Sequence, residues 1–136
     1  MSQENVEIVR QQTEAWQRDD LETWLSTIGA DVEWLSAVER GLGPAGRTYR
    51  GHEGARDLWS LWRTEFVDFW VETGEYRDLR DERVLQLTHM RFRGPASGIL
   101  VESQLALLFT LRDGKIVRSE DYLNHQGALK AVGLEE

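Results

Sequence analysis

The chain has 136 residues and a mass of 15.7 kDa, with a formal net charge of −8 and a pI near 4.9. Its 16 Lys and Arg residues form no run, which argues against binding to a phosphate backbone. The sequence has no cysteine for disulfides, and no apolar stretch or leader that indicates a membrane span or signal peptide. We therefore expect a single cytoplasmic domain over residues 1–136, with no nucleic-acid or membrane partner.

The first third of the sequence has the apolar spacing of helices. One helix is predicted over Asn5–Arg18, and a second apolar stripe follows over Leu21–Ile28. Asp31–Ala37 alternates in the manner of a short strand, with Trp34 on its apolar side.

A glycine-rich segment separates this part from the rest of the chain. Arg40–Gly54 holds five glycines and one proline, which indicates a loop, and a third helix is predicted over His52–Phe66. Four strands are then predicted: Asp68–Asp78, Glu82–Arg93, Ile99–Arg112 and Lys115–Asn124. Helices followed by a strongly curved antiparallel sheet indicate an α+β fold with the helices on one face of the sheet.

The last two strands place one acid, Asp121, on an apolar face. The Asp113-Gly114 turn allows either a two-residue turn or a three-residue loop. The three-residue loop pairs Leu105 with Asp121 and keeps charged side chains off the buried face, so it is the register we expect. A carboxyl group facing an apolar wall must be hydrogen-bonded, protonated or in contact with a polar ligand.

The preceding strand pair offers a partner for this acid. A register in which Leu85 meets Leu107 places His89 beside Ser103, and Arg91 follows at the wide end of the same face. Two strand spacings separate His89 from Asp121, about 10 Å, so we expect the two residues to bracket a ligand. The alternative is a structural Asp121 that is hydrogen-bonded to Ser119, Ser103 or Tyr49, with His89 at the rim.

Three segments carry a resemblance to a known family: YRGHEGARDLW at Tyr49–Trp59, SGILVESQLALLFTLRDGKIV at Ser97–Val117 and EDYLNHQGALKAVGL at Glu120–Leu134. With the order of elements, they resemble the nuclear-transport-factor-2-like superfamily in its SnoaL-like, polyketide cyclase-like branch. The resemblance spans nearly the whole chain. It implies a cone, in which a curved sheet wraps over the N-terminal helices and encloses an apolar pocket, often within a homodimer.

The superfamily includes several activities, so its catalytic sets were compared position by position. The three positions of the ketosteroid isomerase set hold Gln12, Trp34 and Leu107 here, which argues against that mechanism. Limonene epoxide hydrolases share only the final acid, Asp121. The resemblance to SnoaL-type cyclases implies catalysis by Asp121 and His89, since burial raises the pKa of a carboxylic acid toward neutrality.

The remaining candidates are ligand contacts. Besides Trp34, we expect the lining to include Trp16, Trp59, Trp62, Ser103, Leu105, Leu107, Ser119, Arg91 and Tyr49. No His or Glu pair has metal-ligand spacing, so neither a metal nor another cofactor is expected.

Three functions of different classes remain open at this point. The first is a cofactor-independent enzyme that acts on a small hydrophobic carbonyl, hydroxyl or epoxide compound, as a cyclase, isomerase, dehydratase or hydrolase does. The second is a binding protein without turnover, and the third is a dimerisation module whose tryptophans fill the cone. A homodimer is expected through the outer sheet face, formed by Gln104, Ala106, Leu108, Thr110, Ile116 and Tyr122.

Overall fold

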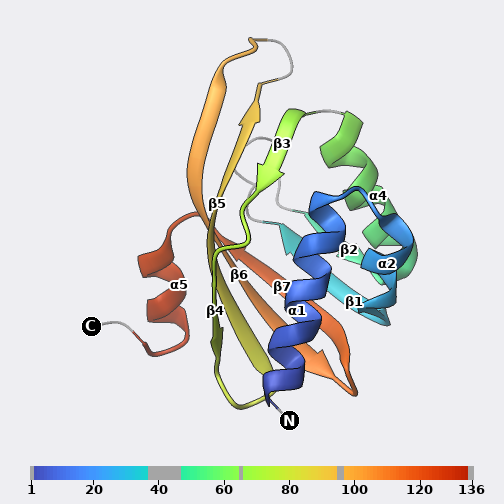
Figure 1. Ribbon diagram of the computed structural model, residues 1–136, viewed down its shortest axis with the longest axis vertical. Helices are drawn as coiled ribbons and strands as arrows, with labels where there is room; N and C mark the ends of the chain where they lie inside the picture. The colour runs from blue at the N-terminus through green and yellow to red at the C-terminus, as the bar shows by residue number, and fades with distance from the viewer. Residues whose placement is uncertain (1, 37–46, 65, 95–96, 135–136) are drawn as a thin grey trace.

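The computed structural model describes residues 2–36, 47–64, 66–94 and 97–134 (Figure 1). The helices within these ranges are α1 (Ser2–Gln17), α2 (Leu21–Ser26), α4 (Gly51–Thr64) and α5 (His125–Ala131). The strands are β1 (Ile28–Ser36), β2 (Arg47–Arg50), β3 (Val67–Val71), β4 (Glu75–Asp78), β5 (Arg83–Arg93), β6 (Leu100–Arg112) and β7 (Lys115–Tyr122). An α+β fold is thus confirmed.

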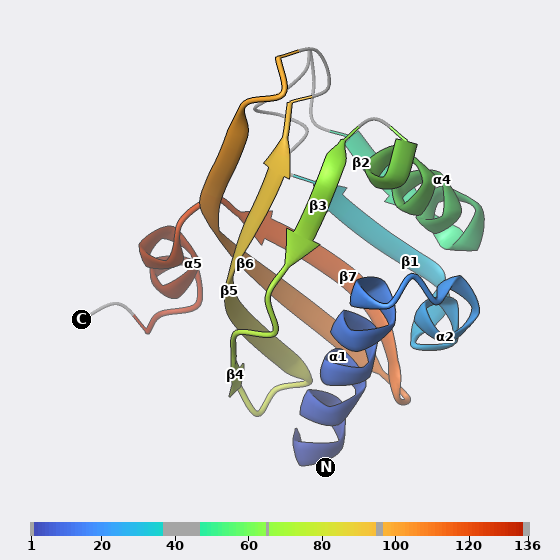
Figure 2. The same cartoon turned by 45° about the horizontal axis from the view of Figure 1, so that its top comes forward.

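All described strands belong to one strongly curled sheet, which Figure 2 shows wrapping around α1. Its order is β2-β1-β7-β6-β5-β3, and β4 pairs with β5 beside β3. The pairing of β1 with β7 is parallel, whereas the other pairs are antiparallel. The sheet is therefore mixed, a detail that the expectation of an antiparallel sheet missed.

The two faces of the sheet have different covers. Helices α1, α2 and α4 lie on the concave face, while α5 lies on the opposite, outer face (Figure 1). The main hydrophobic core fills the concave side and includes the fully buried Val9, Trp24 and Phe109. A smaller core lies under α5, where Ala128 packs with Leu85 and Leu108 of the sheet. The interior of the cone is therefore the space between the concave face of the sheet and helices α1, α2 and α4.

Two predicted segments divide differently in the structure. The predicted loop Arg40–Gly54 contains β2 and the start of α4, and its residues 40–46 lie outside the described ranges. The predicted strand Asp68–Asp78 is two strands, β3 and β4, with a break at Gly74. Gly74 has a φ of +71°, and a Cβ there would lie 2.4 Å from the Leu87 carbonyl oxygen. Only glycine permits the chain to turn this close to β5.

The hairpin between β6 and β7 has a two-residue turn, so the predicted three-residue loop is wrong. Arg112 pairs with Lys115, and both Asp113 and Gly114 have positive φ, as a type I′ turn requires. The register then shifts at a bulge between Ile116 and Arg118. This shift brings Asp121 opposite Leu107 rather than Leu105. Because one bulge reverses the alternation, Asp121 still faces the concave side.

The predicted register between β5 and β6 is wrong by one residue. Leu85 pairs with Leu108 instead of Leu107, and His89 pairs with Gln104 instead of Ser103. A shift of one residue exchanges the two faces of a strand. The leucines of β5 therefore pack under α5 on the outer face, and the alternate residues of β5 face the cone.

Candidate functional site

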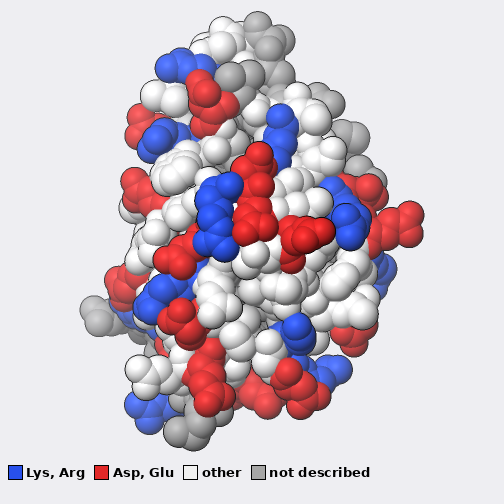
Figure 3. Space-filling view, turned by 45° about the vertical axis from the view of Figure 1, so that its right-hand side comes forward, with Lys and Arg blue, Asp and Glu red and all other residues white. Residues whose placement is uncertain are grey.

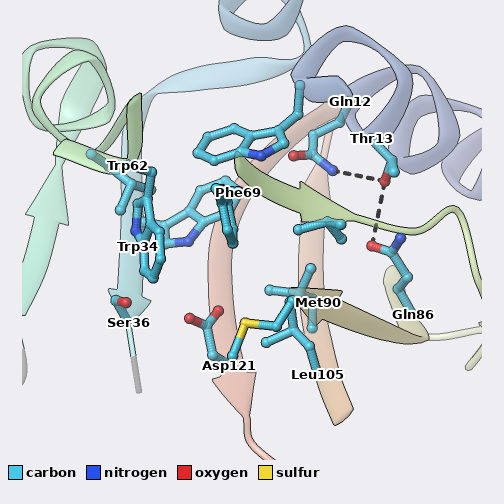
Figure 4. Close-up of a pocket in the computed structure, with 14 residues that line it drawn as sticks. Gln12, Thr13, Trp34, Ser36, Trp62, Phe69, Gln86, Met90, Leu105 and Asp121 are labelled. Atoms are coloured by element: carbon cyan, nitrogen blue, oxygen red, sulfur yellow. Dashed lines mark hydrogen bonds between the residues drawn. The ribbon is translucent and has the colours of Figure 1, made fainter. Parts of the chain in front are cut away.

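A pocket of about 60 Å³ lies between the helices and the concave face of the sheet (Figure 4). It is lined from α1, α4 and five strands, and aromatic and aliphatic side chains form most of its wall. The lining residues are Gln12, Thr13, Trp16, Trp34, Ser36, Leu58, Trp62, Phe69, Val71, Gln86, Met90, Leu105, Leu107 and Asp121. At the roughly 10 to 15 Å³ of such space that one water molecule needs, the pocket has room for about four to six water molecules. The tryptophans thus narrow the cone without closing it.

Asp121 is the acidic group of this pocket. It projects from β7 and is 8% exposed. Its inward direction follows from the alternation of β7 after the bulge, since Ser119 and Asp121 point to the same side. Figure 4 shows its carboxyl group at the sheet side of the pocket, near Met90 and Leu105.

The aromatic wall continues into a cluster behind the pocket. Trp16 packs against Trp24 and Trp59, with ring centroids 5.3 and 5.2 Å away. The guanidinium carbon of Arg63 lies 3.4 Å from the Trp59 ring centroid, and its Nε donates to Asp19 at 2.5 Å. Burial lowers the pKa of Arg63 from its ordinary value, and the hydrogen bond to Asp19 opposes that shift. These contacts hold Trp16 in place from behind.

A polar network lies on the α1 side of the pocket. The indole Nε1 of Trp24 donates to Gln12 Oε1 at 2.8 Å, and Gln12 Nε2 donates to Thr13 Oγ1 at 3.1 Å. Gln86 of β5 joins through a 3.4 Å contact with Thr13 and donates to the Thr73 carbonyl oxygen at 2.9 Å. Dashed lines in Figure 4 mark the contacts of Thr13 with both glutamines. The pocket therefore has one acidic side and one amide side.

Six predicted site residues do line the pocket: Asp121, Trp34, Trp16, Trp62, Leu105 and Leu107. Three others lie behind the wall. Trp59 packs under the guanidinium group of Arg63. Tyr49 of β2 is the register partner of Trp34 on β1 and is only 3% exposed. Ser119 is fully buried between Trp34 and Phe109, and its hydroxyl has no hydrogen-bond partner within the described residues. Their predicted contact with a ligand has no support from this geometry.

His89, Arg91 and Ser103 belong to a different part of the surface. The one-residue register shift turns His89 and Arg91 to the outer face, where the His89 ring lies 5.2 Å from that of His125. Ser103 contributes with them to a separate hollow of about 310 Å³ that also includes Trp70. The predicted placement of His89 opposite Asp121 across a ligand is wrong, and we no longer propose it as a proton carrier.

Sequence reasoning missed several lining residues. Met90 and Gln86 were assigned to the outer face, because Leu85 and Leu87 alternate with them and look like the core side. Gln12 was considered only as a substitution at the isomerase tyrosine position. The sequence feature that could have identified Gln12 as a lining residue is the pair of polar residues Gln12 and Thr13 within the apolar stripe of the first helix.

A second hollow of about 370 Å³ lies on the far side of the aromatic wall, toward Arg63 and Asp68. Four residues line both spaces: Trp16, Trp62, Phe69 and Val71. The ring of Trp62 stacks against Phe69 at a centroid distance of 4.3 Å. These side chains are the wall between the pocket and the surface at this side.

The charged surface shows no organised site on the face seen in Figure 3, where acidic and basic groups are interspersed. Glu33 of β1 forms ion pairs with Arg50 of β2 and Arg118 of β7. Within the described ranges no group of three or more His, Cys, Asp or Glu could hold a metal ion. The described helices are also too short or too polar to cross a bilayer. The predicted cytoplasmic location stays a prediction.

The curled sheet closed by α1 and α4 over an aromatic pocket defines an α+β cone of the nuclear-transport-factor-2-like type. The model of the SnoaL-like domain matches residues 9–119, so the chain belongs to the SnoaL-like domain family. This confirms the resemblance drawn from the sequence. A comparison with curated proteins finds no match.

Solved structures support the same fold. A nuclear-transport-factor-2-like protein of unknown function from Burkholderia pseudomallei K96243 is 21% identical, with a TM-score of 0.78 and coverage of 95% of this chain and 97% of the other. A candidate polyketide cyclase from Xanthomonas campestris pv. campestris is 20% identical, with a TM-score of 0.68 and coverage of 96% and 97%. A protein with a ketosteroid isomerase-like fold from Catenulispora acidiphila DSM 44928, in complex with trimethylamine, is 17% identical, with a TM-score of 0.74 and coverage of 94% and 93%.

Proposed function

We propose that the cone binds a small, largely apolar carbonyl compound and that Asp121 exchanges a proton with it, without a cofactor. The observation that carries this proposal is a carboxyl group, 8% exposed, within a pocket whose wall is otherwise aromatic and aliphatic with a few neutral polar groups. A carboxylate in such surroundings is a suitable base for a weakly acidic C–H group.

The charges of the lining disfavour an anionic ligand. Among the described lining residues Asp121 is the only ionisable group, and Arg, Lys and His contribute nothing to neutralise an anion. The proposed step breaks the C–H bond next to a carbonyl and forms an O–H bond on Asp121. The electron pair of the C–H bond moves to the carbonyl oxygen and gives an enolate. Return of this proton from Asp121 to a different carbon of the enolate completes an isomerisation. Attack of the enolate carbon on a second carbonyl group would instead form a C–C bond and an alkoxide, and transfer of the proton from Asp121 to that alkoxide would complete a cyclisation.

The size of the pocket limits the ligand to a few non-hydrogen atoms unless the aromatic wall moves. A ligand of about five such atoms gains at most about 1.5 kcal/mol per atom, so micromolar affinity is the upper bound and millimolar the working range. The neighbour from Catenulispora acidiphila is in complex with trimethylamine, a molecule of this size class. Butanone fits these limits and carries exchangeable hydrogens beside its carbonyl.

The test is the exchange of these hydrogens for deuterium in D₂O, followed by NMR. The wild-type protein is expected to exchange them faster than buffer, with saturation at millimolar butanone. Asp121→Asn should retain the fold and lose about two to four orders of magnitude of the catalysed rate, the usual contribution of a positioned proton carrier.

The matched control for this test is His89→Gln, which removes a titratable group from the outer face. Because His89 lies on the other side of the sheet, its replacement should leave the exchange rate within a factor of about two. Equal losses in the two variants, or an unchanged rate in Asp121→Asn, would contradict the proposed role of Asp121.

A second candidate function is binding without turnover. The observation that favours it is that Asp121 is the only ionisable side chain among the described lining residues, so the described wall offers no second acid–base group to share the chemistry. This function predicts saturable binding of butanone and no exchange above the buffer rate. The same experiment therefore separates the two functions.

We also propose a homodimer, with a contact surface that differs from the predicted one. Ala106 and Leu108 are buried under α5 within the chain, which removes them from any contact with a second copy. The uncovered part of the outer face holds Trp70 and Leu100, which are 36% and 44% exposed. Sedimentation at tens of micromolar tests this, and a monomer would contradict it.

A further inference from the structure

The amide side of the pocket has a fixed polarity that follows from hydrogen-bond chemistry. An indole N–H only donates, so the 2.8 Å contact from Trp24 must end on the oxygen of Gln12. This fixes which way the Gln12 amide is turned. Its nitrogen consequently faces Thr13, and donates to the hydroxyl oxygen at 3.1 Å.

The other end of the network is fixed in the same way. The carbonyl oxygen of Thr73 only accepts, so the 2.9 Å contact must come from the nitrogen of Gln86. Gln86 then presents its oxygen to Thr13. The hydroxyl hydrogen of Thr13 is left to bond either Gln86 or the carbonyl oxygen of Val9, which lies at 3.2 Å. No member of the chain can flip without losing a buried hydrogen bond.

One donor of this network remains available to a ligand. The amide nitrogen of Gln12 carries two hydrogens, and Thr13 takes one of them. No other acceptor contacts this nitrogen among the described residues, and Gln12 lines the pocket. Figure 4 shows Gln86 with its nitrogen turned away from the pocket, while Gln12 overhangs it. The pocket thus holds one oriented N–H donor from α1, with Asp121 on the sheet side.

We infer that Gln12 donates this hydrogen bond to the carbonyl oxygen of the ligand, so the site selects molecules with an acceptor oxygen beside an acidic C–H group. The inference rests on the proposed function. When Asp121 removes the proton, negative charge develops on that oxygen. A donor already oriented by Trp24 and Thr13 stabilises this charge without reorganisation. Gln12 is in this role a catalytic residue, because it touches the reacting carbonyl.

The first experiment follows the two side-chain amide hydrogens of Gln12 by NMR during a titration with butanone. The hydrogen bound to Thr13 should move little, and the other should shift to lower field with the same saturation curve as the ligand. The side-chain hydrogens of Gln86 should stay unchanged, since that amide is committed to Thr73.

The second experiment measures the carbonyl stretching frequency of bound, ¹³C-labelled butanone by infrared difference spectroscopy. A hydrogen bond from Gln12 should lower this frequency relative to butanone in a hydrocarbon solvent. Gln12→Met keeps a side chain of similar length without a donor and should abolish the shift. Gln126→Met is the matched control, because it removes an exposed glutamine amide of α5, away from the pocket, and should leave the shift intact.

The possible outcomes distinguish this inference from the function it rests on. If Asp121-dependent exchange occurs while the Gln12 signals and the carbonyl frequency stay unchanged, the role of Gln12 is overturned and the proposed function stands. If butanone saturates the pocket but trimethylammonium binds at least as tightly, the selection of an acceptor oxygen is overturned and the proposed function stands. Absence of saturable butanone binding would overturn both.

Discussion

The two faces of the sheet use the same strands and differ in what covers them. On the concave face, α1 and α4 enclose aromatic side chains and a pocket, whereas on the outer face α5 covers only part of the surface. Residues that are adjacent in the sequence therefore have opposite environments. Met90 is 5% exposed and lines the pocket, whereas the side chain of the preceding residue, His89, is 56% exposed. A one-residue difference in register therefore decides which polar groups face the pocket.

The largest expected effect on stability contrasts two leucines of β6 that share the outer face. Leu108 is 5% exposed under α5, and Leu100 is 44% exposed. Leu108→Glu should lower the free energy of unfolding by about 4 kcal/mol or more, because it places a carboxylate in a small apolar core. At protein concentrations where the proposed homodimer is dissociated, the matched change Leu100→Glu should stay within about 0.5 kcal/mol. Denaturant unfolding measures both, and similar costs would contradict the cover provided by α5.

A smaller effect contrasts two tryptophans. Trp24 is fully buried and donates to Gln12, while Trp70 is 36% exposed on the outer face. Trp24→Phe should cost about 2 to 4 kcal/mol, since it leaves a cavity and an unsatisfied amide oxygen. Trp70→Phe should change the free energy of unfolding little. A negligible cost at Trp24 would show that the amide network is not held by its indole.

The next effect has the opposite sign. The Ser119 hydroxyl is fully buried without a hydrogen-bond partner among the described residues, and Ser103 bonds the Gln104 carbonyl oxygen near the surface. Ser119→Ala should raise the free energy of unfolding by about 1 kcal/mol, because it removes an unpaired buried hydroxyl. Ser103→Ala should be nearly neutral. Destabilisation by Ser119→Ala would contradict an unpaired hydroxyl at this position.

The smallest effect is a dependence on alkaline pH. Burial raises the pKa of Tyr76, which packs against the inner core, and that of Tyr122, which packs against the outer core. Stability from the neutral phenols is complete below the unfolded pKa near 10 and is lost as the pH rises through the folded values. Tyr76→Phe should reduce this loss more than Tyr122→Phe. Unfolding measured between pH 9 and about 11.5 checks the order.

The strand content and the inward position of Asp121 were predictable from alternation alone. The predicted turn and register before Asp121 were nevertheless wrong. The inward direction of Asp121 was still correct, because a two-residue turn followed by a bulge places the same alternate residues on the inner face as a three-residue loop does. The bulge has no signal in the sequence. The two-residue turn itself pairs Ile116 with Leu111, so Ile116, which we had assigned to the outer face, lies in the core at 0% exposure.

The position of His89 was not predictable for a different reason. On β5 both alternating sets are buried over Val84–Thr88, since α5 covers the outer face at this point. Apolar alternation then cannot identify the inner face, and the leucines indicated the wrong one. Recognition of α5 as a cover for the outer face would have reversed the assignment and brought Gln86 and Met90 to the pocket.

The central claim is that the ligand site lies on the concave face and not on the outer one. A titration of the ¹⁵N-labelled protein with butanone, followed through the indole N–H signals, tests it directly. The account predicts saturable shifts for Trp16, Trp34 and Trp62, which line the pocket, and none for Trp70 on the outer face. Shifts confined to Trp70 and the neighbouring His89 would contradict it.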